Sequence, residues 1–374
     1  MTPFIALLLL LAATAFLCLV PFLPAFIELH RKSDAAPLDI IRDHDGNIRR
    51  FAAGLRQYLQ RQLSDPALDW GDSEKGAAGA YLKGQFSDGT PFLLLRGSPD
   101  ATETPAVLPD PPARRMIISH RPLLLPARAT FRMDLFATEA IHGGEGSVYR
   151  AVLGDKEILL ARGSTVCRWL HSEDQLLVEP ESTLYGRASA ERLIRLGEGC
   201  QFERLHAARI EFGDAGHQGI SDAGDGAPPG DRRSLQPLAL DRVIDMAGRR
   251  ALVRGDLRIP PGSLFSGDLV VTGQLLIGEG AIIEGSVKSY KDMVLARGVQ
   301  IDGSLVSGRS IAIGPDCRAV GPVVAEREIT VETGARLGSE SRPTTVCSPH
   351  LFIQTGVVAF GTVRAARLGV VISD

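Results

Sequence analysis

Four consecutive stretches of 18 residues decide the fold of this chain: GDLVVTGQLLIGEGAIIE at 267–284, GSVKSYKDMVLARGVQID at 285–302, GSLVSGRSIAIGPDCRAV at 303–320 and GPVVAEREITVETGARLG at 321–338. Each stretch opens with glycine and carries apolar residues at its third, ninth and eleventh positions. One more stretch upstream keeps the frame through Leu257, Ile259, Gly262 and Phe265. Five blocks in register predict a solenoid of stacked repeats.

Within each block, apolar residues form pairs at positions i and i+2, and the pairs recur every six residues. Two inward positions separated by one outward position are typical of a short strand. Three such strands complete one turn of a β-helix with 18 residues per coil. Residues near the end of each block supply the turns: Gly280, Gly298, Asp316 and Gly334. The predicted fold class is therefore all-β.

An earlier and less regular array has the same period. Its apolar pairs follow each other at 18-residue intervals: Ile158 with Leu160, Leu176 with Val178, and Ile194 with Leu196. We extend this array upstream to Met116, and we expect the C-terminal array to resume after an insertion near Pro343 and Pro349. The predicted organisation is a degenerate array at 116–212, a flexible Gly- and Pro-rich insertion at 213–248, and a regular array at 249–374.

The N-terminus contains no charged residue from Pro3 to Ile27. This length of apolar sequence matches the thickness of a bilayer and predicts a transmembrane anchor at 1–30. His30, Arg31 and Lys32 follow the span and nothing basic precedes it, so the positive-inside rule places the C-terminal bulk in the cytoplasm.

Residues 31–115 are predicted to hold a short helix and a linker. Phe51, Leu55, Leu59 and Leu63 recur at helical spacing and form one apolar face. That face could lie on the membrane surface or pack against the protein's own β region. Residues 66–115 contain seven prolines and one apolar run, 92–95, and we interpret them as a linker with one hairpin.

Composition excludes several functions. A net charge of -3 and a pI near 6.3 give no basic footprint for nucleic acid. The five cysteines are odd in number and lack C-x-x-C spacing, which argues against a disulfide framework or a zinc site and favours a reducing compartment. No P-loop is present, so no nucleotide, metal or other cofactor is predicted.

The hexapeptide period is also similar to that of left-handed β-helix acyltransferases, through Leu295-Ala296 and Val299, Ile301-Asp302 and Leu305, and Ile313-Gly314 and Cys317. Such enzymes need a histidine base in a cleft, and residues 249–338 contain none. The other histidines have no recurring partner: His120, His142, His171, His206, His217 and His350. Ser147, Ser164 and Ser182 lack a nucleophile elbow. No catalytic residue is predicted, and His350 is the alternative if the chain is an enzyme.

The blocks Gly285-Ser286-Val287, Gly303-Ser304-Leu305 and Gly321-Pro322-Val323, each followed by a short polar turn and an apolar pair, resemble those of bactofilins, the polymer-forming bacterial cytoskeletal proteins. The resemblance covers residues 249–372 and implies a right-handed β-helix that assembles end to end without nucleotide. It also implies a scaffold at the bacterial inner membrane that localises cell-envelope or morphogenesis proteins. The predicted anchor and the long N-terminal half depart from the family's usual short form.

Self-association through a terminal coil needs exposed strand edges. Apolar residues near the C-terminus are the candidates for this contact: Phe360, Val370, Val371 and Ile372. They could equally close the last turn of the array. A third function class is a membrane-bound β-helix that binds a partner without polymerising. A stripe of exposed aromatic residues would favour it, and only Tyr290 looks outward in the regular array.

Overall fold

The computed structural model describes residues 3–23, 50–65, 68–76, 79–96, 105–108, 114–213, 236–237, 243–247 and 250–373. The chain divides into two compact units, Met1–Asn47 and Ile48–Asp374, which are described separately. The basic residues expected just after the anchor, from His30 to Arg49, lie outside the described residues.

The first unit contains helix α1 (Pro3–Leu19), followed by the single 3-10 turn η1 (Val20–Phe22). Its run of leucines favours a helix, and Pro21 lies in the first turn of η1, where a missing N–H costs nothing. Among the residues that the structure describes, no helix is both long enough and apolar enough to cross a membrane.

The second unit begins with helix α3 (Arg50–Leu63) and four strands. These strands are β1 (Asp69–Gly76), β2 (Gly79–Gln85), β3 (Pro91–Leu95) and β4 (Ala106–Val107). The N-terminal array follows, with β5 (Met116–Ser119), β6 (Leu123–Leu124), β7 (Thr130–Phe131), β8 (Leu135–Ala137), β9 (Ile141–Gly143), β10 (Val148–Gly154), β11 (Ile158–Leu160), β12 (Thr165–Ser172), β13 (Gln175–Val178), β14 (Thr183–Ala190), β15 (Leu193–Leu196) and β16 (Gln201–Phe212).

The C-terminal array follows. Its strands are β17 (Gln236–Pro237), β18 (Val243–Ala247), β19 (Arg250–Val253), β20 (Leu257–Ile259), β21 (Ser263–Ser266), β22 (Asp268–Val271), β23 (Leu275–Ile277), β24 (Ile282–Glu284), β25 (Val287–Ser289), β26 (Met293–Leu295), β27 (Gln300–Ile301), β28 (Leu305–Ser307), β29 (Ser310–Ile313), β30 (Arg318–Ala319), β31 (Val323–Ala325), β32 (Glu328–Val331), β33 (Arg336–Leu337), β34 (Thr344–Gln354) and β35 (Val358–Ile372).

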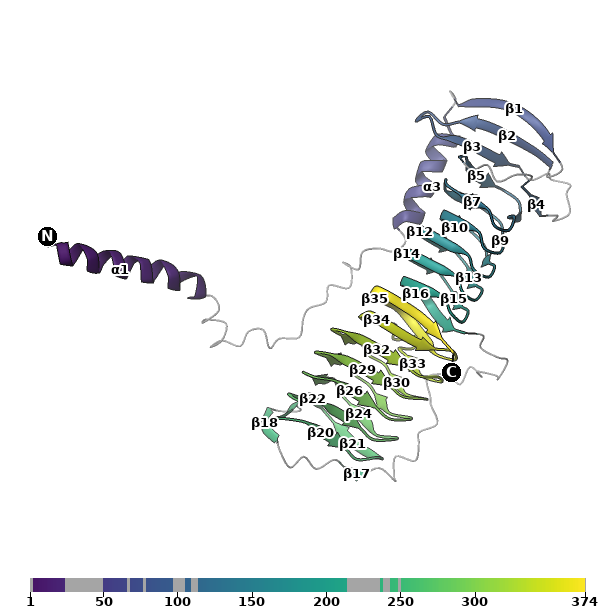
Figure 1. Cartoon of the computed structure of the whole chain (residues 1–374). Helices are drawn as coiled ribbons and strands as arrows, with labels where there is room; N and C mark the ends of the chain where they lie inside the picture. Colours follow the sequence, from purple (N-terminus) through teal and green to yellow (C-terminus); the bar gives the residue numbers. More distant parts are fainter. Residues whose placement is uncertain are drawn as a thin grey trace. The chain divides into compact units, whose positions relative to one another are not determined.

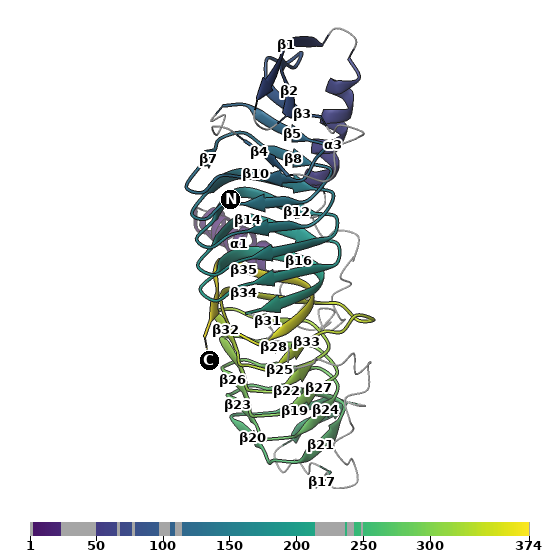
Figure 2. The same cartoon turned by 90° about the vertical axis from the view of Figure 1, so that its right-hand side faces the viewer.

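These strands form a β-solenoid of about 12 turns, which confirms the predicted β-helix and its repeat (Figures 1 and 2). Each strand pairs in parallel with the equivalent strand of the next coil. One such column joins Leu275 to Met293, Met293 to Ile311, and Ile311 to Ile329, 18 residues apart each time. All four side chains are at most 1% exposed, so the interior of the coil is a continuous apolar core.

Glycines fix how closely successive coils approach. A Cβ atom at Gly285, Gly303 or Gly321 would lie less than 3.0 Å from the backbone of the coil before it, a distance that real Cβ atoms essentially never show. At the turns the requirement is conformational. Gly280, Gly298 and Gly334 have positive φ angles, and Asp316 adopts the same left-handed conformation at φ 56°.

Residues 66–115, expected to be a linker with one hairpin, contain more structure than that. Strands β1, β2 and β3 form an antiparallel meander, while β3 and β4 pair in parallel with β5 and β6. The reason lies in the run 92–95, all of which is buried. Leu93 and Leu95 face the solenoid core, and Phe92 and Leu94 face outward beneath α3.

Helix α3 packs against the outer face of the solenoid, which settles the two readings of its apolar stripe. Ala52, Leu55 and Leu59 are buried in a second core outside the coils. Outward side chains of successive strands complete that core: Phe92, Leu94, Met116, Ile118, Phe136 and Leu153. The helix therefore covers one face of the first coils.

The two arrays join into one solenoid. Strand β16, the last of the N-terminal array, pairs antiparallel with β35, the last of the C-terminal array. After β16 the chain passes to the far end of the solenoid, where β19 begins, and the C-terminal array then climbs back to meet β16 (Figures 1 and 2). Most of the predicted flexible insertion, including 214–235, lies outside the described residues.

Candidate functional site

The four residues predicted for self-association all lie in β35, at the seam between the two arrays. Phe360 is 9% exposed and Val371 is 1% exposed, while Val370 and Ile372 are half-buried. Val371 donates its N–H to the carbonyl of Cys200 at 2.9 Å and accepts the N–H of Gly199 at 2.9 Å. These contacts lie within one chain.

The seam is closely packed. Leu205 lies opposite Val363 and His206 lies opposite Thr362. Nδ1 of His206 is 2.9 Å from Oγ1 of Thr362. Gly369 faces the ring of Phe202 so closely that a Cβ atom at this position would collide with it. Because β34 pairs with the other edge of β35, the last strand of the chain has a partner on both sides.

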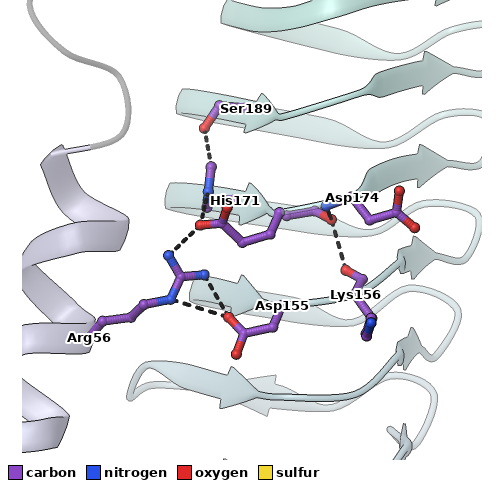
Figure 3. A network of polar contacts seen from close by, with 8 residues as sticks. Arg56, Asp155, Lys156, His171, Asp174 and Ser189 are labelled. Carbon is purple, nitrogen blue, oxygen red and sulfur yellow. Dashed lines mark hydrogen bonds and ion pairs between the residues drawn. The ribbon is translucent and has the colours of Figure 1, made fainter.

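A polar network lies where α3 contacts the N-terminal array (Figure 3). Arg56 of α3 bridges two carboxylates on adjacent coils. Its Nη2 is 2.6 Å from Oδ1 of Asp155, and its Nη1 bonds Oε1 of Glu173. One face of Arg56 is thus bound to two coils, which fixes the register of the helix along the solenoid.

His171 extends this network inward. It is 2% exposed, with Nδ1 2.8 Å from Oγ of Ser189 and Nε2 3.2 Å from Oε1 of Glu173. Burial lowers the pKa of His171, and the neighbouring Glu173 acts in the opposite direction. Lowering from a model value of 6.5 leaves the imidazole neutral near pH 7.

Glu191 is the third acidic residue of this region. Asp155, Glu173 and Glu191 follow each other at 18-residue intervals, so they occupy the same position of three successive coils. Ligand atoms of His171, Glu173 and Glu191 all lie within 4.8 Å of one another. Among the described residues, no other group of three or more His, Cys, Asp or Glu side chains has this spacing.

An aromatic stack borders the network. The ring of Phe51, in the first turn of α3, lies parallel to that of Trp169, with centroids 4.9 Å apart. The guanidinium of Arg187, on the next coil, lies 5.3 Å from the Trp169 centroid. These contacts and the Arg56 bridges hold the N-terminal end of α3 against the solenoid.

The serines considered at the sequence level have structural partners. Ser164 and Ser182 follow turns and donate their hydroxyls to carbonyls three residues earlier, Ala161 and Glu179, the latter at 2.9 Å. Cys200 takes the equivalent place in the next coil and donates to the same Glu179 carbonyl at 3.2 Å. Burial raises the pKa of Cys200 to about 11, so this thiol is protonated and unreactive at neutral pH.

His350, the alternative catalytic residue, lies half-buried in β34 opposite Glu328 and Leu368. His120 and His142 are exposed, and His217 lies outside the described residues. The structure therefore does not bring His350 together with His171 or with the seam.

Sequence reasoning missed the cluster of His171, Glu173 and Glu191 because its members come from different coils. The signal was present in the period itself. Subtracting 18 places Glu191 on Glu173, and Ser189 on His171. Reading outward as well as inward positions at this interval would have found the carboxylate ladder.

Comparison with known proteins identified no relative. No protein-family model, no curated protein and no solved structure matches the chain. The fold and the side-chain geometry therefore carry the functional argument alone.

Proposed function

We propose that this chain is a membrane-tethered, non-enzymatic scaffold that associates with further copies of itself and requires no nucleotide. The observation that carries the proposal is the continuous sheet of the second unit, in which each coil is hydrogen-bonded to the next through both arrays. A solenoid of this kind offers long, repetitive faces for other proteins. The resemblance to bactofilins points the same way and implies a right-handed coil.

Helix α1 supports the tether. Its apolar side chains are exposed on all sides, with Leu10 at 65%, Phe16 at 68% and Leu17 at 75%. An all-round apolar helix is stable only when something apolar covers it. We propose that lipid of a bacterial inner membrane does so, with the solenoid on the cytoplasmic side and cell-envelope proteins as its partners.

The structural roles of the polar side chains support a scaffold over an enzyme. Buried serines and cysteines donate to turn carbonyls, and Arg56 links α3 to the coils. A hexapeptide acyltransferase is the alternative if His350 proves essential to an activity. A binding module that does not polymerise is the alternative if the chain stays monomeric.

Self-association is proposed to use the first coil of the C-terminal array. In the single chain, the edge of β35 that carries Val370 is paired with β16, so Phe360, Val370, Val371 and Ile372 would join two chains only if this seam opened. At the opposite end, β20 pairs with β23 alone among the described strands. Leu257 and Phe265 pack on the core there but are only partly buried.

The tether is tested by flotation of the full chain with liposomes of anionic and zwitterionic lipid. Leu10→Arg with Leu17→Arg should abolish flotation, because two charges would have to enter the lipid. Leu124→Arg is the matched control, since Leu124 is an exposed leucine of the solenoid at 42%. Flotation unchanged by the double substitution would contradict the tether.

Self-association is tested by negative-stain electron microscopy and sedimentation, with and without nucleotide. Leu257 donates its N–H to Gln274 of the next coil, so the N–H of Arg258 points to the opposite edge. Arg258→Pro should remove that edge donor and reduce assembly, whereas Arg258→Ala should not. Discrete trimers would favour the acyltransferase, and monomers of the unaltered protein would favour the binding module.

A further inference from the structure

The stacked carboxylates of the N-terminal array need positive charge. Asp155, Glu173 and Glu191 occupy equivalent positions of successive coils, and equivalent residues of adjacent parallel strands are about 4.8 Å apart. Like charges at this spacing destabilise a sheet unless a cation lies between them. Arg56 supplies one positive charge and contacts the first two carboxylates. Glu191, on the third coil, instead lies near the buried imidazole of His171.

His171 is oriented as metal-binding histidines usually are. A hydrogen bond at one ring nitrogen fixes the ring and directs the other nitrogen toward the ligand. Here Nδ1 is held by Oγ of Ser189 at 2.8 Å, and Nε2 faces Glu173 and Glu191. The imidazole is 2% exposed and its pKa is lowered by burial, so its nitrogen lone pair is available at neutral pH.

The spacing of the ligand atoms also fits. Two ligands bound tetrahedrally to Zn²⁺ at 2.0–2.1 Å lie about 3.3 Å apart. Nε2 of His171 and Oε1 of Glu173 are 3.2 Å apart, and the carboxylate of Glu191 lies within 4.8 Å of both ligand atoms. Glu191 is half-buried and Glu173 exposed, so small rotations of these flexible side chains bring both carboxylates onto one ion.

We propose that His171, Glu173 and Glu191 bind one divalent transition-metal ion, with Zn²⁺ as the ion that a histidine and two carboxylates fit best. Water completes the coordination. Without the ion, Nε2 carries a proton and donates it to Glu173. Binding therefore releases that proton and strengthens as the pH rises.

Arg56 competes with the ion, because its guanidinium bonds the same oxygen of Glu173 that faces His171. Occupancy weakens the bond between Arg56 and Glu173, while the bond to Asp155 at 2.6 Å remains. The metal site thus lies directly beside the contact that orients α3, and it is independent of whether the chain assembles.

The test is isothermal titration of the full chain in detergent with ZnCl₂, after removal of metal by chelation. Cys18→Ser and Cys167→Ser form the background, because these two thiols are exposed. One Zn²⁺ should bind per chain at pH 7.5. His171→Ala and Glu191→Gln should each weaken binding by at least about tenfold, as loss of groups at a metal site does.

Two further variants distinguish this site from adventitious binding. His206→Ala removes another half-buried histidine of the same strand column and should leave the affinity unchanged. Arg56→Gln should tighten binding by up to about fivefold, the size of effect expected for one partly exposed ion pair. Failure to bind one Zn²⁺, or equal affinities in His171→Ala, Glu191→Gln and the unaltered chain, would overturn the proposal.

Discussion

The two arrays reach the same coil by different means. In the C-terminal array the strands of the regular coils are two to four residues long, for example β26 and β27, and outward positions stay open to solvent. In the N-terminal array β12 and β14 have eight residues and β16 has twelve. Register shifts interrupt the pairing of β10 with β12 and of β14 with β16.

The difference follows from what lies outside the coils. Leu94, Ile118, Phe136 and Leu153 form one outward column beneath α3, where the C-terminal array has polar residues. An array that buries both faces of one sheet reads as a broken repeat, because its outward positions are apolar too. Degeneracy in the sequence therefore reflects a covered face, since the inward positions keep their period.

The largest expected effect is in the uncovered array, where nothing outside the coil compensates for a disturbed stack. Gly303→Val places side-chain atoms against the backbone of Gly285, so coils must separate. We expect a loss of more than about 4 kcal/mol in the free energy of unfolding, measured by denaturant titration. Gly298→Ala is the control. It has open space and only an unfavourable φ of 68°, and should cost about 1 kcal/mol. Equal losses in both variants would contradict this account of the stack.

Removing the cover should affect only the N-terminal array. Leu59 of α3 is 3% exposed, so Leu59→Ala should cost about 3 kcal/mol. Hydrogen exchange should rise in β3, β5 and β8, which contribute to the outer core, and stay unchanged in β23, β26 and β29. Equal acceleration in both arrays would show that α3 stabilises the whole solenoid. Gln57→Ala, at an exposed position of the same helix, is the matched control.

The seam should respond to overpacking by a smaller amount. Gly369→Val forces its side chain into the ring of Phe202 and should destabilise the junction by about 2 kcal/mol. Calorimetry should then resolve separate transitions for the two arrays, because β16 and β35 no longer couple them. A single unchanged transition would mean that the seam contributes little to cooperativity.

The smallest effect is a pH dependence specific to the N-terminal array. Burial lowers the folded pKa of His171 below its unfolded value, so protons favour the unfolded chain and stability falls as the pH decreases from about 6.5 toward the folded pKa. Arg56, Glu173 and Glu191 are the charged groups around it. Thermal unfolding at pH 7.5 and 5.5 should show a larger drop for the unaltered chain than for His171→Asn. An equal drop in both would contradict the assignment.

Glu173 contributes in a separate range. Burial raises its pKa, but hydrogen bonds from Arg56 and His171 outweigh burial, and the resulting pKa is below 4.5. Stability from this group is present above the unfolded pKa and is lost only as the pH falls through the folded value. The comparison between pH 7.5 and 5.5 therefore isolates His171.

The sequence was sufficient for the repeat and insufficient for what covers and joins it. Inward residues such as Leu275 and Met293 announce the coil because their period is local and strict. The outer core of Leu55 and Phe136 was not predicted, since it depends on a helix meeting a sheet distant in the chain. The helix α3 itself was predicted from its apolar spacing.

The seam was not predictable in the same way. Residues 360 to 372 read as the end of an array, and periodicity says nothing about which strand lies beyond an end. Antiparallel pairing with β16 also reverses the direction that every other coil uses, so no repeat indicates it. The carboxylate ladder was predictable in principle, because Asp155, Glu173 and Glu191 keep the 18-residue interval.

The most direct test of this account is a disulfide across the seam in the full chain. His206→Cys with Thr362→Cys, in a background of Cys18→Ser, Cys167→Ser and Cys347→Ser, places two thiols where Nδ1 and Oγ1 now lie 2.9 Å apart. Mild oxidation should give a monomeric, intramolecularly closed chain on non-reducing electrophoresis, with assembly through the opposite end preserved. Cross-links that form only between chains, or none at all, would contradict a seam that joins the two arrays within one molecule.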